Sequence, residues 1–165
     1  MLKNRQLLVL FVGLIFIGVG ILWFYQVKVK LATSLPKVSQ TSLNLYQRLK
    51  NLPDHSLTQV KVGKKVYTLE VVNTPTSLTQ GLGDRDFDEV KGDGMIFVLP
   101  KKQVTRFWMK GMRFPLDFYW LDENGQVVGE IKNVPPPKSG QPLRSLPVVT
   151  SPEPVWLVVE VARWF

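Results

Sequence analysis

The chain has 165 residues and no cysteine, and its 21 lysine and arginine residues outnumber the 13 acidic ones, which gives a net charge of +8. This length suits one domain with its own core plus an appendage, and is too short for two ordinary domains. The lack of cysteine excludes disulfides, zinc–thiolate sites and thiol nucleophiles.

The positive charge is concentrated near the amino terminus. Residues 1–60 carry a net charge of +6, whereas the remainder carries +2 and has no lysine or arginine cluster as dense as a phosphate-binding surface requires. Nucleic acid is therefore not an expected partner.

The stretch from Leu7 to Tyr25 contains no charged residue. It nearly reaches the roughly 20 apolar residues that a transmembrane helix needs, and the aromatic residues at 23–25 suit a membrane interface. A cleavable signal peptide usually has a shorter apolar region and a small-residue cleavage site, and the sequence after Tyr25 makes a poor one. We therefore predict a single-pass membrane anchor.

The orientation of this anchor is only weakly encoded. Lys3 and Arg5 precede it and Lys28 and Lys30 follow it, so the positive-inside rule is nearly balanced. The free amino terminus tips the balance toward a cytoplasmic amino terminus, with the bulk of the chain outside the cytoplasm. The predicted parts are a cytoplasmic tip and transmembrane helix at 1–30, a stalk at 31–58 and a β domain at 59–165.

The predicted stalk is polar and contains Pro36 and Pro53. Three leucines between them, Leu45, Leu49 and Leu52, have helical spacing. This pattern fits a short amphipathic helix or a flexible linker with transient helix, and both interpretations stay open. The only histidine, His55, lies at the end of this segment and is expected to be solvated, because no second histidine can form a metal pair with it.

The β domain begins with a strand pattern. Residues 60–72 predict a hairpin around Gly63, since β-branched residues flank the turn. Thr74 and Pro75 predict the N-cap and first position of one short helix. An acidic loop and a short apolar strand at 95–99 follow, and we expect Pro100 to end that strand.

The second half of the domain predicts two strands within the stretch 106–125, a return strand at 127–132 and a last strand at 155–161. The pair Asn124-Gly125 between two apolar runs is a strong hairpin signal. Residues 133–154 contain seven prolines and are assigned to an extended surface loop. Residues 155–161 are apolar on both faces apart from Glu160, which is typical of a central, doubly covered strand. We predict a mainly β fold, a compact β-sandwich or barrel-like domain with one short helix.

The sequence lacks the complete motifs that several kinds of functional site require. The acidic loop places Asp84, Asp86 and Asp88 at the first, third and fifth positions of a calcium loop, but Glu89 stands where glycine is needed and Met95 where a bidentate glutamate is needed. Serine-hydrolase and glycine-rich phosphate-loop motifs are missing from the sequence. The sequence thus predicts no metal and no cofactor.

The remaining candidate site lies in the stretch 106–125, which mixes aromatic residues with charges. Strand alternation places Asp117 on the face opposite Phe118, and Trp108 and Lys110 on one face of the preceding segment. If the two segments are neighbours, these side chains form an aromatic floor with charges of both signs, as in a small-ligand or sugar pocket. A structural ion pair beside core aromatics is an equally weighted alternative.

The chain also resembles a known family. The motifs are residues 71–85, Gly94-Met-Ile-Phe97, Phe107-Trp-Met-Lys110, Pro115-Leu-Asp117 and Asp122-x-x-Gly125. Their order over about residues 60–162 resembles the uncharacterised domain of unknown function 192 family. The resemblance implies a mostly β domain with a short helix, often behind a signal or membrane anchor, and no established activity. Two departures are Gly83, where the family usually has methionine, and Gly111-Met112, where it usually has Asn-Thr.

Three functional hypotheses follow. The first is a membrane-anchored extracytoplasmic domain that binds a small polar ligand or cell-envelope component through Arg85, Trp108, Lys110 and Asp117. The second is a hydrolase-like enzyme in which Asp117 is the catalytic acid or base and Arg85 holds an anion. The third is a structural or protein-interaction module that uses the stalk and the loop 133–154.

Overall fold

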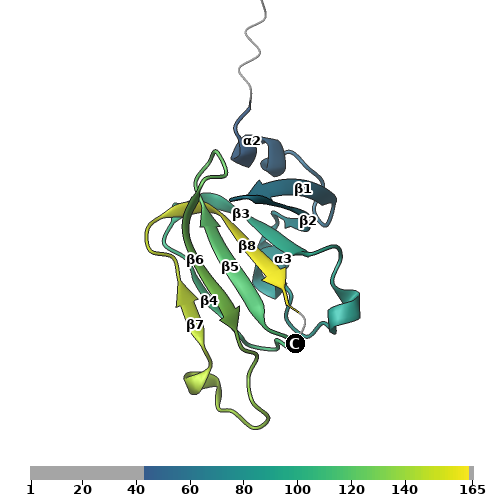
Figure 1. Cartoon of the computed structure of the whole chain (residues 1–165), viewed down its shortest axis with the longest axis vertical. Helices are drawn as coiled ribbons and strands as arrows, with labels where there is room; N and C mark the ends of the chain where they lie inside the picture. The colour runs from purple at the N-terminus through teal and green to yellow at the C-terminus, as the bar shows by residue number, and fades with distance from the viewer. Residues whose placement is uncertain (1–42, 164–165) are drawn as a thin grey trace, which may run out of the picture. The chain divides into compact units, whose positions relative to one another are not determined.

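The computed structural model describes residues 43–163, and these form a mainly β fold with few short helices. Six strands build one sheet that curls into a half-barrel, and two short strands form a separate ribbon beside it (Figure 1). The mainly β prediction is confirmed. The arrangement is a curled sheet with a small second ribbon, rather than a sandwich of two comparable sheets.

The large sheet has the strand order β1-β2-β3-β8-β5-β6. Only β2 and β3 run parallel, and every other pair in this sheet is antiparallel. Its strands are β1 (Leu57–Val62), β2 (Lys65–Val72), β3 (Gly94–Gln103), β5 (Leu116–Leu121), β6 (Val127–Val134) and β8 (Val155–Ala162). The ribbon pairs β4 (Arg106–Trp108) with β7 (Val148–Thr150), and the helices are α2 (Leu45–Lys50), α3 (Pro75–Gln80), η1 (Phe87–Glu89) and η2 (Leu143–Ser145).

The last strand, β8, lies at the centre of the sheet between β3 and β5 (Figure 1), as its two apolar faces predict. Gly94 allows β3 to approach it closely. A Cβ atom at Gly94 would collide with the backbone carbonyl of Glu160, and the φ angle of Gly94 is 151°. This close approach fixes the register that places Met95 opposite Glu160.

Local signals give the hairpins and the helix start correctly. β1 and β2 pair around the turn at Gly63, and β5 and β6 pair around Asn124-Gly125. Thr74 caps α3, with its hydroxyl accepting from Ser77 N–H and Pro75 in the first turn. The Asp54 carboxylate extends this cap by accepting hydrogen bonds from the hydroxyls of Thr74 and Ser77 at 2.8 and 2.9 Å.

Two expectations from the sequence are wrong. β3 continues through Pro100 to Gln103. Its pairing with β8 is irregular between Val98 and Gln103, so Pro100, which has no N–H group, does not have to donate a hydrogen bond to the neighbouring strand. The segment 133–154 also contains regular structure, because β7 pairs with β4. The residues Arg106–Trp108 therefore neighbour β7 in a ribbon and not β5 in the large sheet.

Each face of the sheet has its own core. One core contains Phe97, Phe118 and Val158 and is covered by α3 and the β4–β7 ribbon. The other contains Leu69 and Val159 and is covered by α2, whose buried residues are Tyr46 and Leu49. The Tyr46 and Trp156 rings pack 4.5 Å apart, so α2 belongs to the folded domain.

The predicted transmembrane helix at Leu7 to Tyr25 and the stalk residues 31–42 lie outside the described residues. Within 43–163, no helix is both long enough and apolar enough to cross a membrane. The membrane anchor stays a prediction from the sequence.

Candidate functional site

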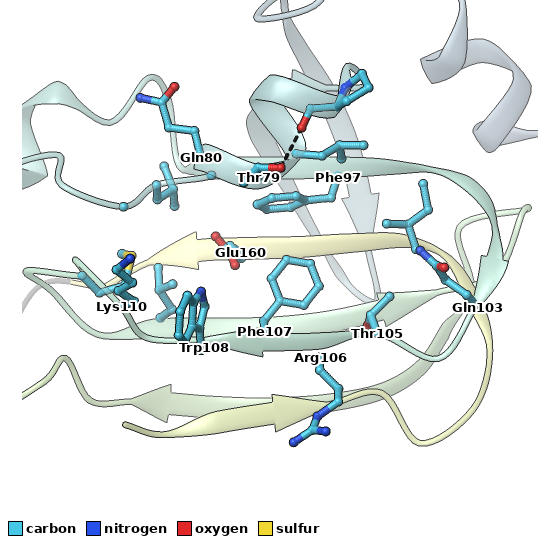
Figure 2. A pocket seen from close by; sticks show the side chains of 18 of the residues that line it. Thr79, Gln80, Phe97, Gln103, Thr105, Arg106, Phe107, Trp108, Lys110 and Glu160 are labelled. Carbon is cyan, nitrogen blue, oxygen red and sulfur yellow. Dashed lines mark hydrogen bonds between the residues drawn. The ribbon is translucent and has the colours of Figure 1, made fainter. Parts of the chain in front are cut away.

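A cavity of about 730 Å³ lies on the face of the sheet that α3 and the ribbon cover (Figure 2). Its walls come from α3 and the turn after it, from β3, and from the segment that carries β4. Leu82, Phe97, Leu99, Phe107, Met112 and Leu116 supply apolar surface. This mixture of an apolar lining with a few polar groups is the usual composition of a small-molecule site.

Glu160 lies on the floor of this cavity. Its carboxyl group points into the space between the rings of Phe97 and Phe107, which come from β3 and β4 (Figure 2). Only 5% of the residue surface is exposed, and no hydrogen bond or ion pair with any residue in 43–163 engages the carboxyl group. Burial raises the pKa of Glu160 to about 8. Most molecules therefore carry an uncharged carboxylic acid here at neutral pH.

The other buried carboxylates in the described chain are all partnered. Glu70 accepts from Arg85, and Asp117 accepts from the Asn133 backbone. Burial of an unpaired polar group costs stability, so native structures normally supply a partner. Glu160 departs from this rule at a cavity, which is the place where a ligand can supply the partner.

Thr105 is a second unsatisfied polar group in the same cavity. The residue is buried, its Oγ1 atom has no hydrogen-bond partner, and it lines the cavity near Phe107. Its backbone is fully engaged, because Thr105 N–H donates to Ser151 Oγ and its carbonyl accepts from Ser151 N–H. These backbone bonds hold the threonine in place, and its buried hydroxyl has no hydrogen-bond partner within the described residues.

Trp108 and Lys110 lie at one end of the cavity, and Gln103 lies at the other (Figure 2). Trp108 is 53% exposed, and the Lys110 ammonium lies 5.2 Å from the centre of its ring. Gly111 makes the turn after Lys110 with a φ of 72°, and a Cβ there would meet the Asp84 carboxylate. Glycine suits this position because the left-handed conformation and the lack of a side chain are both needed.

Arg85 is engaged elsewhere. Its guanidinium donates to Glu70 Oε2 at 2.7 Å, and His55 Nδ1 lies 2.6 Å from Glu70 Oε1. Although burial opposes ionisation, the bonds from Arg85 and His55 lower the pKa of Glu70 below its ordinary value of 4.5. The His55 side chain is 45% exposed, in keeping with the expectation of a solvated histidine, and it also contacts the Glu70 carboxylate.

Asp117 faces the other side of the sheet. It is 2% exposed, its Oδ1 accepts from the Asn133 backbone N–H at 2.8 Å, and Arg163 lies 3.5 Å from its Oδ2. It lines a separate hollow of about 430 Å³ together with Tyr119 and Lys132. The sequence hypothesis that Asp117 meets Trp108 and Lys110 is wrong, because β4 pairs with β7 and β5 pairs with β8 and β6.

The four predicted site residues are thus divided. Trp108 and Lys110 share the cavity with Glu160, whereas Arg85 and Asp117 each complete a separate polar network. Sequence reasoning did not select Glu160 or Thr105. The available signal was Glu160 itself, the one charge in an otherwise apolar central strand, since such a carboxylate needs either a partner or a ligand.

The comparison with family models decides the membership of this chain. The model of DUF192, the domain of unknown function 192, which is described as an uncharacterised ACR, matches residues 58–164. The chain belongs to the DUF192 family. The match runs from β1 through β8 and so includes the whole large sheet, the ribbon and the cavity. It confirms the resemblance that the sequence motifs indicate.

Two solved structures share the fold of this DUF192 domain. One is a "putative transcription regulator" from Sinorhizobium meliloti 1021, with a TM-score of 0.53 and 20% identity over 67% of this chain and 84% of the other. The second is a protein of unknown function from Novosphingobium aromaticivorans DSM 12444, with a TM-score of 0.50 and 22% identity over 64% and 71%. Similarity at this level of identity describes the fold alone. No curated protein matches the chain.

Proposed function

We propose that this DUF192 domain binds a small polar ligand in the cavity above Glu160. The observation that carries the proposal is the carboxyl group of Glu160, a buried residue, which has no partner within residues 43–163 and is directed into the cavity. A bound ligand would supply the hydrogen bonds that the chain does not. The cost of leaving such a group unsatisfied, about 1–3 kcal/mol, would then be recovered on binding.

The rest of the cavity supports the same proposal. Thr105 adds a second free hydrogen-bonding group, and Phe97 and Phe107 shield the floor from water. Trp108 offers an exposed ring at the entrance, where a ligand can stack, and Lys110 adds a cation beside it. A volume of about 730 Å³ accommodates a molecule of metabolite size.

Ligand-dependent thermal stabilisation tests the proposal. The full chain is heated with a panel of small cationic, anionic and uncharged molecules, alongside the variants Glu160→Ala and Trp108→Ala. A ligand at 100 times its Kd stabilises the native state by about 2.7 kcal/mol, which raises Tm by several degrees. We expect the rise with wild-type protein and a smaller rise with both variants.

Asp117→Asn is the matched control, because Asp117 lies on the opposite face of the sheet and is also buried. It should lower Tm without ligand but leave the ligand-induced rise unchanged. If Asp117→Asn and Glu160→Ala reduced the ligand-induced rise in Tm equally, the ligand would not bind in the cavity. A panel that stabilises none of the proteins would argue against a ligand site here.

We further propose that the domain is held outside the cytoplasm by a membrane anchor at residues 7–25. The support is the uncharged run from Leu7 to Tyr25 with its aromatic end. Reporter fusions after residue 60 test the orientation. Activity of a reporter that works only outside the cytoplasm supports it, and activity of a cytoplasm-only reporter contradicts it.

A further inference from the structure

We propose that the ligand of this cavity is uncharged and rich in hydroxyl groups, as a neutral sugar or polyol is, and that Glu160 donates a hydrogen bond to it as a carboxylic acid. This inference rests on the proposed ligand site and adds the chemical class of the ligand. It also assigns a protonation state to Glu160 in the complex.

The surroundings of Glu160 argue against a charged partner. Its strand neighbours in the sheet are Met95 and Phe118, and α3 contributes Thr79 and Gln80 to the cavity, none of which is charged. An ammonium group brought onto this floor would lose its hydration among aromatic and aliphatic side chains. That loss commonly offsets most of the attraction of a buried ion pair.

The charges that line the cavity also disfavour a cationic ligand. They are Asp84, Arg106 and Lys110, two cations and one anion apart from Glu160 itself. Arg106 points away from the cavity, whereas Lys110 lies at its end beside Trp108 (Figure 2). The Lys110 ammonium, which lines the same cavity, would repel a cationic ligand. A neutral ligand meets no such repulsion.

The hydrogen-bonding groups match hydroxyls. A carboxylic acid presents one O–H donor beside one carbonyl acceptor, and the free Thr105 hydroxyl can also donate and accept. A ligand hydroxyl is likewise both donor and acceptor, so it can satisfy either group without a net charge. Gln80 and Gln103 extend this uncharged polar lining toward the rim. The exposed Trp108 ring provides a flat surface for the apolar face of a sugar ring.

The proposal makes binding dependent on the proton of Glu160. Burial raises the pKa of Glu160 to about 8, so the acid form that binds a neutral ligand predominates at pH 7 and becomes scarce above pH 8. Apparent affinity scales with the populated competent fraction. Wild-type affinity should therefore fall roughly tenfold by pH 9, and binding at pH 8.5 should take up a proton.

The experiment compares three sugars that differ in charge at pH 6: N-acetylglucosamine is neutral, glucosamine is mostly cationic and glucuronate is anionic. Isothermal titration calorimetry with the full chain, in a detergent that has no sugar headgroup, gives affinity and proton uptake between pH 6 and 9.5. The variant Glu160→Gln keeps a donor and an acceptor but carries no ionisable group. We expect it to bind N-acetylglucosamine within a few-fold of wild type at pH 7 and to lose the pH dependence.

Glu160→Ala removes both hydrogen-bonding atoms and should weaken N-acetylglucosamine binding at least tenfold. Preference for glucosamine, together with loss of its binding in Glu160→Gln, would overturn the inference, because it would show that an ionised carboxylate pairs with a cation. Binding of charged molecules from the thermal panel but of no neutral sugar would overturn it too, and would leave the proposed ligand site intact. If no molecule of the thermal panel or the sugar panel bound, the proposed ligand site itself would be wrong.

Discussion

Asp117 and Glu160 lie on paired neighbouring strands but face opposite sides of the sheet. In the register of β5 with β8, Asp117 lies opposite Val161, and Glu160 lies opposite Phe118. Phe118 packs in the core beneath α3 and the ribbon, whereas Val161 packs in the core on the α2 side. One of the two buried carboxyls is therefore partnered within the chain, and the other opens into a cavity.

Replacement of Glu160 by glutamine should stabilise the domain at neutral and alkaline pH. The ordinary pKa of a glutamate is 4.5, whereas that of buried Glu160 is raised to about 8. Folding of the wild type thus takes up a proton between these values, and its stability falls as pH rises through that window. We expect Glu160→Gln to be more stable by roughly 3 kcal/mol at pH 7, with little difference at pH 4.

Urea denaturation of both proteins at pH 4, 7 and 9 measures this difference. The control is Glu153→Gln, at an exposed position after β7, which should leave the pH dependence of stability unchanged. A gain for Glu160→Gln that is the same at pH 4 and pH 9 would contradict a proton-linked origin.

Removal of Arg85 should destabilise the fold without affecting the cavity. Arg85→Met leaves the buried Glu70 carboxylate with His55 and the more distant Lys91, 3.8 Å away. Loss of one partner of a buried ion pair costs about 3 kcal/mol. Because the pKa of Glu70 is lowered, its stabilising contribution is present above 4.5 and is lost as pH falls through its folded value, so the deficit should shrink in acid.

A double-mutant cycle with Glu70→Gln checks this pairing by chemical denaturation. The coupling between Arg85 and Glu70 should be about 2 kcal/mol, and ligand affinity of the folded Arg85→Met protein should equal that of wild type. A large drop in ligand affinity of Arg85→Met at unchanged stability would show that Arg85 contributes to the ligand site.

Substitution of Asp117 should act on the end of β6. Asn133 has a φ of 55° and donates its backbone N–H to Asp117. Asp117→Ala leaves that N–H without its acceptor, at a cost of about 1–2 kcal/mol, whereas Asp117→Asn retains an acceptor oxygen and should cost less. Hydrogen exchange at Asn133 measures the effect directly. Unchanged protection of this amide in Asp117→Ala would show that the bond contributes little.

Truncation of Trp108 should weaken binding more than folding. Its ring is largely exposed, so Trp108→Ala should change the free energy of unfolding by less than about 1 kcal/mol. Loss of a stacking surface should lower ligand affinity roughly tenfold, and Trp108→Phe should restore much of it. Val104→Ala serves as a control at another exposed apolar position of the lining. Equal affinity of Trp108→Ala and wild type would exclude stacking on this ring.

The sequence predicts the parts of this fold that depend on near neighbours. Thr74 and Pro75 encode the start of α3 because capping involves only the first turn of a helix. Asn124-Gly125 encodes the β5–β6 hairpin because apolar runs lie on both sides of a residue pair that favours positive φ angles, and Gly125 has a positive φ in the structure. The alternation of β5 also correctly separates Asp117 from Phe118.

The ribbon could not be predicted in the same way. The two strands β4 and β7 are short and separated by the whole of β5 and β6, so their pairing depends on contacts that no local pattern records. A prediction that lacks this pairing puts Arg106–Trp108 beside β5 and joins Asp117 to Trp108 and Lys110 in one hypothetical site. The information that the local pattern lacks is the long-range pairing of β4 with β7.

The mainly β domain of this family, its hairpins, its capped helix and its buried central strand follow from the sequence alone, because propensity, turn chemistry and alternation act over a few residues. The cavity above Glu160 on one face of that strand follows from the tertiary structure. Alternation tells that Glu160 leaves the strand on one side, but partners for a buried carboxyl come from elements distant in the chain. Here α3, β3 and the ribbon surround Glu160 without offering one.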